Sequence, residues 1–308
     1  MIFSSVLALS AMLMAPAEAA TPAPSLSEAP ITFEANDGTA VAAMRGSFQV
    51  PERRADPDSR LITLHYVRFP ATTSKPGAPI VYLAGGPGGS GIGTAEGSRF
   101  PLFMALRKFG DVIAFDQRGT GASSDLPECT SSIVVPADRP VSGVERGDLY
   151  RAAVRECAAF WTSEGIDLKG YSTLESAADL DALREHLGAE TISLWGISYG
   201  THLALAAMKT MPDRLDRVIL ASAEGLAQTV KLPARTDAYF ARLQAAIDSQ
   251  PAAKAIFPDI RSMIRQVHGQ LEAKPVTLTV KDDEGGEQQV VIDRATMQGI
   301  ASGMIADP

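Results

Sequence analysis

A serine between two glycines carries the strongest chemical signal in this sequence. Residues 196–200 read G-I-S-Y-G, the pattern G-x-S-x-G, and they lie between an apolar run at 192–195 and a helix-like run at 201–208. A tight strand-to-helix turn of this kind strains the backbone of the serine and presents its hydroxyl at the edge of a sheet. The helix N-terminus beside it favours the oxyanion that forms during acyl transfer. We therefore predict that Ser198 is a nucleophile.

A glycine-rich loop is the second signal. Residues 84–91 read A-G-G-P-G-G-S-G and follow an apolar run at 80–84. Such a loop can donate a backbone N–H to the reacting carbonyl oxygen, together with the N–H of Tyr199, the residue after the nucleophile. The loop lacks the Gly-Lys-Ser/Thr ending of a P-loop, and no helix clearly begins there, which argues against a dinucleotide site. A plain flexible turn remains the alternative.

A third motif, D-Q-R-G-T-G-A-S at residues 116–123, follows the next apolar run. Asp116 is predicted to accept hydrogen bonds from backbone N–H groups, and Arg118 to hold the loop through a charge-assisted bond. We favour a structural role here, because the turn at 196–200 already supplies a nucleophile.

In this order, the three motifs resemble those of the proline iminopeptidase / tripeptidyl aminopeptidase family, over about residues 79–225. The stretch 171–188 and the spacing of Cys129 and Cys157 are similar to the larger, exported branch of that family. Ala84 stands where the family usually has a histidine, as it does in part of the exported branch.

The resemblance implies an α/β-hydrolase in which Ser198 is the nucleophile and Gly85 and Tyr199 form the oxyanion hole. It also implies that residues 226–308 begin a lid inserted into the hydrolase sheet. Lids of this kind shape the pocket for a short peptide and its free amino end.

Glu224 lies just past the apolar run at 217–221, where side chains can face the mouth of the site. A carboxylate there could hold a substrate ammonium by a charge-assisted hydrogen bond. The alternative is a loop carboxylate bonded to backbone.

The apolar runs predict the elements that position these residues. Continuous apolar runs at 80–84, 112–116, 192–195 and 217–221 are typical of strands buried on both faces of a parallel sheet, and helical stretches alternate with them. The sequence predicts an α/β domain over residues 31–225, with a mostly parallel sheet and flanking helices. Residues 226–308 read as a mainly helical, incomplete lid containing a hairpin.

The net charge argues against one class of partner, and the N-terminal residues indicate export. A formal charge of -8 argues against a nucleic-acid partner, which would need a basic surface. Residues 1–19 have the apolar run and small-residue cleavage site of a signal peptide, although no basic residue precedes the run, so an ordinary N-terminal helix is the alternative. Residues 20–30 read as a disordered leader. We therefore expect a secreted or periplasmic protein with no stable membrane insertion after signal cleavage.

The two cysteines, Cys129 and Cys157, are expected to form a disulfide in an oxidising compartment, with two free thiols as the alternative. Neither has the spacing of a metal site. No metal, nucleotide, flavin or other cofactor is expected.

The sequence does not supply an evident base for Ser198. In α/β-hydrolases the acid and then the histidine follow the serine. His268 is the one histidine well downstream, and it lies in the lid pattern. We therefore hypothesise that the chain is a C-terminally truncated fragment that lacks the catalytic acid, the histidine and the last sheet strands, and that this form is inactive or nearly so.

The leading prediction is a serine aminopeptidase that cleaves short peptides from their free amino terminus through an acyl-enzyme. Two alternatives remain: a carboxylesterase on the same scaffold, and a non-catalytic remnant that binds a ligand or partner. The sequence does not indicate an oligomeric state.

Overall fold

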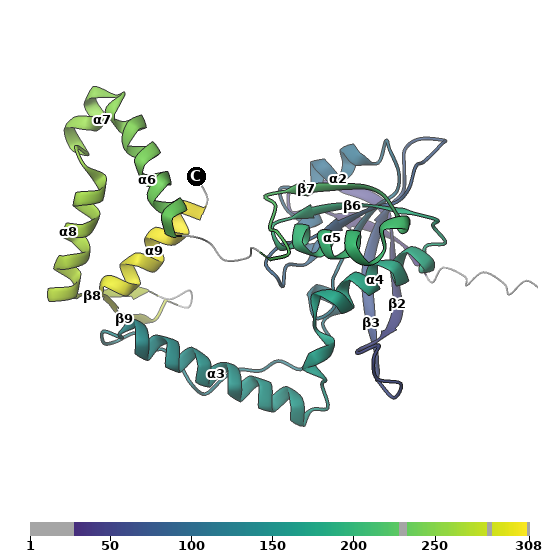
Figure 1. The fold of residues 1–308 in the computed structure, drawn as a ribbon, viewed down its shortest axis with the longest axis horizontal. Coiled ribbons are helices and arrows are strands. Elements are labelled where there is room, and N and C mark those ends of the chain that lie inside the picture. The colour runs from purple at the N-terminus through teal and green to yellow at the C-terminus, as the bar shows by residue number, and fades with distance from the viewer. Residues whose placement is uncertain (1–27, 228–232, 282–284, 307–308) are drawn as a thin grey trace, which may run out of the picture.

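The computed structural model describes residues 28–227, 233–281 and 285–306 (Figure 1). The expected signal peptide and residues 20–27 of the expected leader lie outside the described residues. Among the described helices, none combines the length and the apolar character that a membrane span requires.

A seven-stranded sheet forms the centre of the larger part of the chain. Its strands are β1 (Glu28–Glu34), β2 (Ala40–Pro51), β3 (Leu61–Phe69), β4 (Ile80–Leu83), β5 (Val112–Phe115), β6 (Ile192–Ile197) and β7 (Leu215–Ala221). The order in the sheet is β1-β2-β3-β5-β4-β6-β7. The first three strands pair antiparallel, β3 pairs antiparallel with β5, and β5, β4, β6 and β7 are parallel neighbours, so all strands except β1 and β3 run in one direction. The predicted mostly parallel sheet is confirmed.

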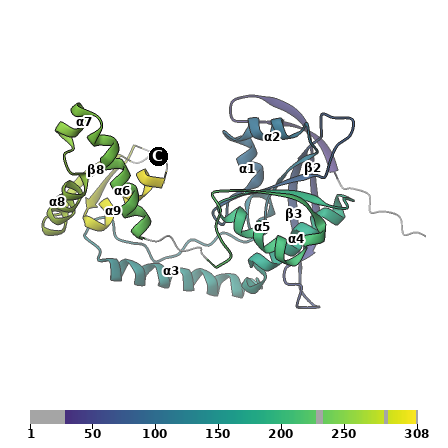
Figure 2. The same ribbon diagram turned by 45° about the horizontal axis from the view of Figure 1, so that its top comes forward.

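Helices cover both faces of this sheet, as Figure 2 shows. One face packs against α1 (Gly91–Glu96) and α2 (Phe100–Leu106), and the other against α4 (Thr173–His186) and α5 (Tyr199–Thr210). Every residue of β4 and β5 is buried, and so is all of β6 except Ile197, because side chains on both faces of these strands contact a helix layer. The turn at Ser198 therefore follows directly after one of these buried strands.

One sequence inference about the glycine-rich loop is wrong. We expected no helix to begin there, but α1 starts at Gly91, and the Ser90 hydroxyl accepts the Gly93 N–H as its cap. Glycine is a poor helix former, so two glycines within six residues concealed the helix. The loop is held at one end by β4, which pairs with β5 and β6, and at the other end by the cap of α1. It is therefore not the plain flexible turn considered above.

The expected leader is also too long. Glu28, Ala29 and Pro30 belong to β1 and pair with residues 44–46 of β2. The Glu28 carboxylate accepts hydrogen bonds from the Tyr66 hydroxyl at 2.9 Å and from the Arg68 guanidinium. The charge-assisted bond between Glu28 and Arg68 helps to hold residues 28–30 in the strand, although their composition is typical of a loop.

Helices and a hairpin make up the described residues after 232. They are α6 (Pro233–Asp248), α7 (Pro251–Ile256), α8 (Ile260–Ala273), β8 (Val276–Lys281), β9 (Glu287–Ile292) and α9 (Arg294–Ala306). β8 and β9 pair antiparallel, as expected for the hairpin in the lid. The division between core and lid near residue 225 stays a prediction.

A helix of the predicted core reaches this lid region. In Figure 1, α3 (Gly143–Ser163) extends from the sheet towards α8, β8 and β9. The Val291 N–H donates to the Ala137 carbonyl at 2.9 Å, and the Val141 N–H donates to the Asp293 carboxylate at 3.2 Å. The segment before α3 is therefore hydrogen-bonded to the lid as well as continuous with the core, which the boundary drawn from sequence did not anticipate.

A disulfide joins Cys129 to Cys157 and so connects the segment before α3 to the middle of that helix. The Trp161 indole N–H donates to the Pro127 carbonyl at 2.9 Å and holds the same segment further along the helix. Together these contacts fix the long segment 126–142 along α3.

His186, at the end of α4, is a partly buried titratable group that contacts two aromatic rings. Its ring stacks on Phe48 with centroids 5.1 Å apart and meets Tyr66 edge-on at 5.8 Å. Its Nε2 atom is buried and has no hydrogen-bond partner among the described residues. Burial lowers the pKa of His186 below its ordinary value of 6.5, against the opposing charge of Glu28.

We expect this histidine to make stability fall in mild acid. Because the folded pKa is the lower one, the unfolded chain binds more protons below pH 6.5, and the free energy of unfolding decreases as the pH falls through the folded pKa. Urea unfolding between about pH 7 and about pH 5 would measure this slope. In His186→Phe the slope should be smaller, and an unchanged slope would contradict the assignment.

Candidate active site

Ser198 occupies the turn between β6 and α5. It is the N-cap residue of α5 and has φ 53 and ψ -124, a backbone conformation that non-glycine residues rarely adopt. Strained backbone of this kind is concentrated at functional sites. The Thr201 N–H donates to the Ser198 carbonyl at 2.8 Å, which closes the turn, and the Ser198 side chain is left partly exposed at the carboxyl end of β6.

The glycines of the motif are required by close backbone contacts. A Cβ atom on Gly196 would lie 2.5 Å from the Gly200 carbonyl oxygen, and one on Gly200 would lie 2.0 Å from the Leu83 carbonyl oxygen. Both distances are too short for a side chain. The two glycines therefore allow β6, α5 and the end of β4 to meet at the turn, which brings the glycine-rich loop beside Ser198.

Gly85, in that loop, lies beside Ser198. A Cβ atom built on Gly85 would lie 3.0 Å from the Ser198 Cβ and 3.6 Å from its Oγ. The loop is fixed by the Gly89 N–H, which donates to the Gly85 carbonyl at 3.1 Å, and by the Gln117 side-chain amide, which donates to the Ala84 carbonyl at 3.1 Å. The structure thus brings Gly85, Ser198 and Tyr199 into one place, and the oxyanion hole formed by Gly85 and Tyr199 remains a proposal.

Glu224 lies against the nucleophile. The Ser198 hydroxyl donates to Glu224 Oε1 at 3.3 Å. The backbone of Glu224 is fixed as well, because its N–H donates to the Thr201 hydroxyl at 2.8 Å, and that hydroxyl donates to the Ser198 carbonyl at 2.7 Å. Thr201 is fully buried. The carboxylate is therefore oriented towards Ser198, and in the described part of the chain its hydrogen bond is with this side chain and not with backbone, the alternative considered from the sequence.

Tyr199 is held by its side chain. Its hydroxyl lies 3.0 Å from Thr173 Oγ1 at the start of α4, and its ring stacks on His202 with centroids 5.8 Å apart. These contacts orient the first residue of α5, whose N–H is the expected second oxyanion donor.

The loop at 116–123 has the structural role predicted for it. Asp116 is buried and accepts hydrogen bonds from the Ser90 hydroxyl at 2.6 Å and from the N–H groups of Ile92 and Ala122. Arg118 donates two hydrogen bonds to Asp179, at 2.7 Å and 2.6 Å. The predictions of a backbone-capping carboxylate and a charge-assisted lock are confirmed.

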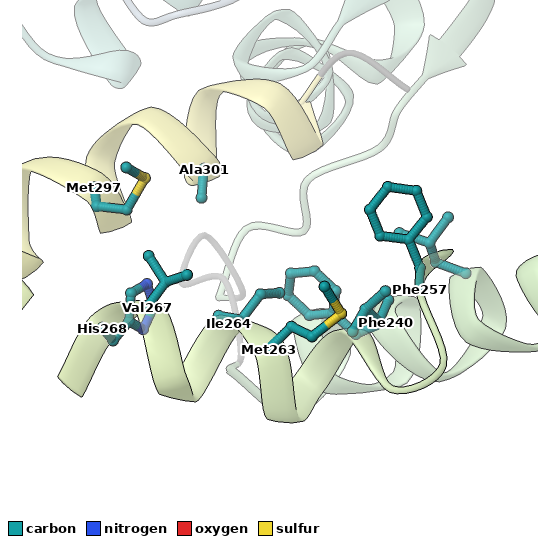
Figure 3. Close-up of a pocket in the computed structure, with 10 residues that line it drawn as sticks. Phe240, Phe257, Met263, Ile264, Val267, His268, Met297 and Ala301 are labelled. Carbon is teal, nitrogen blue, oxygen red and sulfur yellow. The ribbon is translucent and has the colours of Figure 1, made fainter. Parts of the chain in front are cut away.

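The described histidines do not provide a base in contact with Ser198. His202 Nδ1 lies 3.3 Å from the Gly225 carbonyl, and His65 lies in β3. His268 lines an apolar cavity of about 370 Å³ between α8 and α9, as Figure 3 shows. In the part of the chain that the structure describes, the side-chain hydrogen bond of Ser198 Oγ is with Glu224.

The fold and this turn agree with a known family. Residues 78–281 match the family model described as alpha/beta hydrolase fold. The chain belongs to the α/β-hydrolase family. The resemblance stated from the three motifs is confirmed, since relatives with the expected names also match.

Among these relatives is the serine protease Hip1 of Mycobacterium tuberculosis, 31% identical over 184 residues that cover 58% of this chain and 35% of that protein. The tripeptidyl aminopeptidase of Streptomyces lividans is 31% identical over 192 residues, 58% of this chain and 34% of that protein. A probable proline iminopeptidase of Leptolyngbya boryana is 27% identical over 157 residues, 51% of this chain and 35% of that protein. The chain thus spans about a third of the length of these relatives.

Solved structures also match at low similarity. Cfl2 from Burkholderia cenocepacia has a TM-score of 0.39 and 18% identity, covering 80% of this chain and 64% of that one. A proline iminopeptidase-related protein from Thermus thermophilus has a TM-score of 0.34 and 20% identity, covering 57% of this chain and 44% of that one.

Sequence reasoning missed Thr201 and Thr173 in this α/β-hydrolase. The signal for Thr201 was its place three residues after the nucleophile, where a hydroxyl in the first turn of a helix can bond the carbonyl of the preceding turn. Thr173 is the first residue of α4, and its approach to Tyr199 depends on how α4 packs against α5, which no local pattern records.

Proposed function

We propose that this α/β-hydrolase chain carries the nucleophile and the oxyanion hole of a serine peptidase that removes residues from the free amino terminus of short peptides. The observation that carries the proposal is the pair Ser198 and Glu224, a strained serine whose hydroxyl is bonded to a carboxylate at 3.3 Å. The peptidase names of the relatives support the same class of reaction.

In the proposed reaction, Ser198 Oγ attacks the carbonyl carbon of the scissile amide. The N–H groups of Gly85 and Tyr199 stabilise the oxyanion, and the positive end of α5 contributes to that stabilisation. The C–N bond then breaks, the amine departs with a proton, and the acyl group stays on Ser198 as an ester. Water hydrolyses the ester and returns the proton to the serine oxygen.

Glu224 is proposed to bind the substrate's amino terminus. A substrate ammonium can replace the Ser198 hydroxyl as the donor to this carboxylate, in a charge-assisted hydrogen bond. The released serine oxygen is then free to attack. This arrangement would favour peptides with a free amino end over blocked peptides and over neutral esters.

The general base and acid that activate Ser198 are proposed to come from sequence that follows Pro308. This assignment rests on the order of catalytic residues in the family, in which the acid and the histidine follow the serine. Export to the periplasm or the medium, through the signal peptide predicted at residues 1–19, remains part of the same proposal.

The proposal predicts a strong preference for a free amino group. The full-length protein should hydrolyse alanine 4-nitroanilide with a kcat/KM at least about tenfold higher than that for N-acetyl-alanine 4-nitroanilide, since a hydrogen bond to a charged group is worth about 1.5–3 kcal/mol. A chromogenic assay of both substrates, with 4-nitrophenyl acetate as a third, measures this. Turnover of the ester alone would instead support the carboxylesterase alternative.

A fluorophosphonate probe separates these enzymes from the non-catalytic alternative. Covalent labelling at Ser198, identified by mass spectrometry, is the expected result. An unlabelled, folded full-length protein would contradict the peptidase proposal and favour a binding role.

A further inference from the structure

We infer that the spacing of Ser198 and Glu224 limits the enzyme to releasing one residue at a time. The inference rests on the proposed function, because it takes Glu224 as the group that holds the substrate's amino terminus. It chooses between two product lengths that the names of the relatives leave open, a single residue and a tripeptide.

The first step is the distance available at the site. Glu224 Oε1 lies 3.3 Å from Ser198 Oγ, the atom that attacks. At attack the carbonyl carbon stands about 3–3.5 Å from Oγ. A carboxylate this close to the nucleophile can therefore bond only to substrate atoms that lie within a few bonds of the reacting carbon.

The second step is the length of the substrate. When one residue is removed, the α-ammonium nitrogen and the scissile carbonyl carbon belong to the same residue and lie about 2.5 Å apart, from standard bond lengths and angles. The ammonium of such a substrate falls within hydrogen-bond distance of the Glu224 carboxylate. When a tripeptide is removed, two further residues separate the groups and add about 7 Å in an extended chain. The ammonium of that substrate lies beyond the reach of Glu224.

The third step is that Glu224 cannot easily move away. Its N–H is bonded to the Thr201 hydroxyl at 2.8 Å, and the next carbonyl, that of Gly225, lies 3.3 Å from His202 Nδ1. Thr201 and His202 both belong to α5, the helix that begins directly after Ser198. The turn that carries Ser198 and the backbone of residues 224 and 225 are therefore held by the same helix, and this places the Glu224 side chain next to Ser198. We assign Thr201 as the positioning residue for Glu224.

A substrate series tests the length directly. The full-length protein is assayed with the 4-nitroanilides of Ala, Ala-Ala and Ala-Ala-Ala, and the first product from Ala-Ala-Ala-Ala-Phe is identified by mass spectrometry. Single alanine should appear first, and kcat/KM for the one-residue substrate should exceed that for the three-residue substrate by at least about tenfold, the effect of one charge-assisted hydrogen bond.

Variants of the two residues give a matched control. Glu224→Gln should lower kcat/KM for alanine 4-nitroanilide by about 10- to 100-fold, and should lower kcat/KM for 4-nitrophenyl acetate, which lacks an amino group, by a clearly smaller factor. Thr201→Val should raise KM for alanine 4-nitroanilide more than it lowers kcat, and Thr201→Ser, which keeps the hydroxyl, should restore the wild-type KM.

The outcomes separate this inference from the proposed function. Release of Ala-Ala-Ala before alanine would overturn the one-residue limit and leave an aminopeptidase. Equal turnover of free and N-acetylated substrates would contradict the proposed function itself. An equal loss in Glu224→Gln for the arylamide and the ester would show that Glu224 acts on the chemical step, and the inference would be wrong.

Discussion

Replacing Ser198 by alanine should reduce kcat for alanine 4-nitroanilide by about 10⁴- to 10⁶-fold, because in the proposed mechanism Ser198 is the group that forms the covalent intermediate. The substitution removes a single oxygen atom, whose hydrogen bond is with Glu224 at 3.3 Å. The backbone of the turn keeps its bonds, since the N–H and carbonyl of Ser198 pair with Ala221 and Thr201. Steady-state kinetics of the full-length variant measure the loss.

Thermal unfolding provides the control for Ser198→Ala. The melting temperature should stay within a few degrees of that of the wild type, since no buried group loses its partner. Fluorophosphonate labelling should disappear along with the activity. A folded variant that keeps a tenth or more of the wild-type kcat would show that another residue is the nucleophile.

Replacing Asp179 by asparagine should have the largest effect on stability. Asp179 is fully buried and accepts hydrogen bonds from two guanidinium groups, those of Arg118 and Arg54. Loss of its charge removes the two short bonds to the buried Arg118 from a full carboxylate and leaves the Glu175 carboxylate, 3.8 Å away, as the remaining ion-pair partner of that guanidinium among the described residues. Breaking a buried pair of this kind costs about 3–5 kcal/mol. Urea unfolding followed by circular dichroism would measure the decrease in the free energy of unfolding.

Asp148→Asn is the matched control for Asp179→Asn. Asp148 forms an ion pair with Arg151 on α3, and both side chains are more than 60% exposed. Exposed pairs contribute about 0–1 kcal/mol. Equal destabilisation by the two substitutions would contradict the view that burial gives the Asp179 network its importance.

The turn at Ser198 between a strand and a helix could be predicted from sequence because all its determinants are local. The glycines, the serine and the flanking apolar strand lie within ten residues, and only a strand–turn–helix satisfies them together. The structural role of the loop at 116–123 was predictable for the same reason, since Asp116 accepts a hydrogen bond from the backbone of the nearby residue Ala122. Each of these predictions needed only the geometry of one short segment.

The rest of the site depends on contacts between distant segments. Arg118 was expected to form a charge-assisted bond, but its partner Asp179 is separated from it by 61 positions. The contact between Glu224 and Ser198 spans 26 positions and depends on how β7 pairs with β6. Such partners are set by packing of elements against one another, and several acidic residues of the sequence would have fitted either role equally well.

The helix α3 shows the same limit at the level of domains. It is one of the helical stretches expected between the apolar runs at 112–116 and 192–195. None of its side chains is fully buried, so the residue pattern of the helix does not indicate which elements it contacts. The hydrogen bonds that join its leading segment to the lid, at Ala137 and Val141, are made largely by backbone atoms and therefore leave little trace in the residue types.

The attachment of residues 224 and 225 to α5 has a consequence for engineering. The predicted lid begins directly after this anchored loop. The proposed binding site for the substrate's amino terminus therefore lies outside the lid. Exchanging the lid for that of another family member should alter which side chains are accepted, while the unit cut from each peptide stays the same. In the proposed peptidase, the length of the released unit and the choice of side chain would therefore be set by separate parts of the chain, and each could be redesigned without disturbing the other.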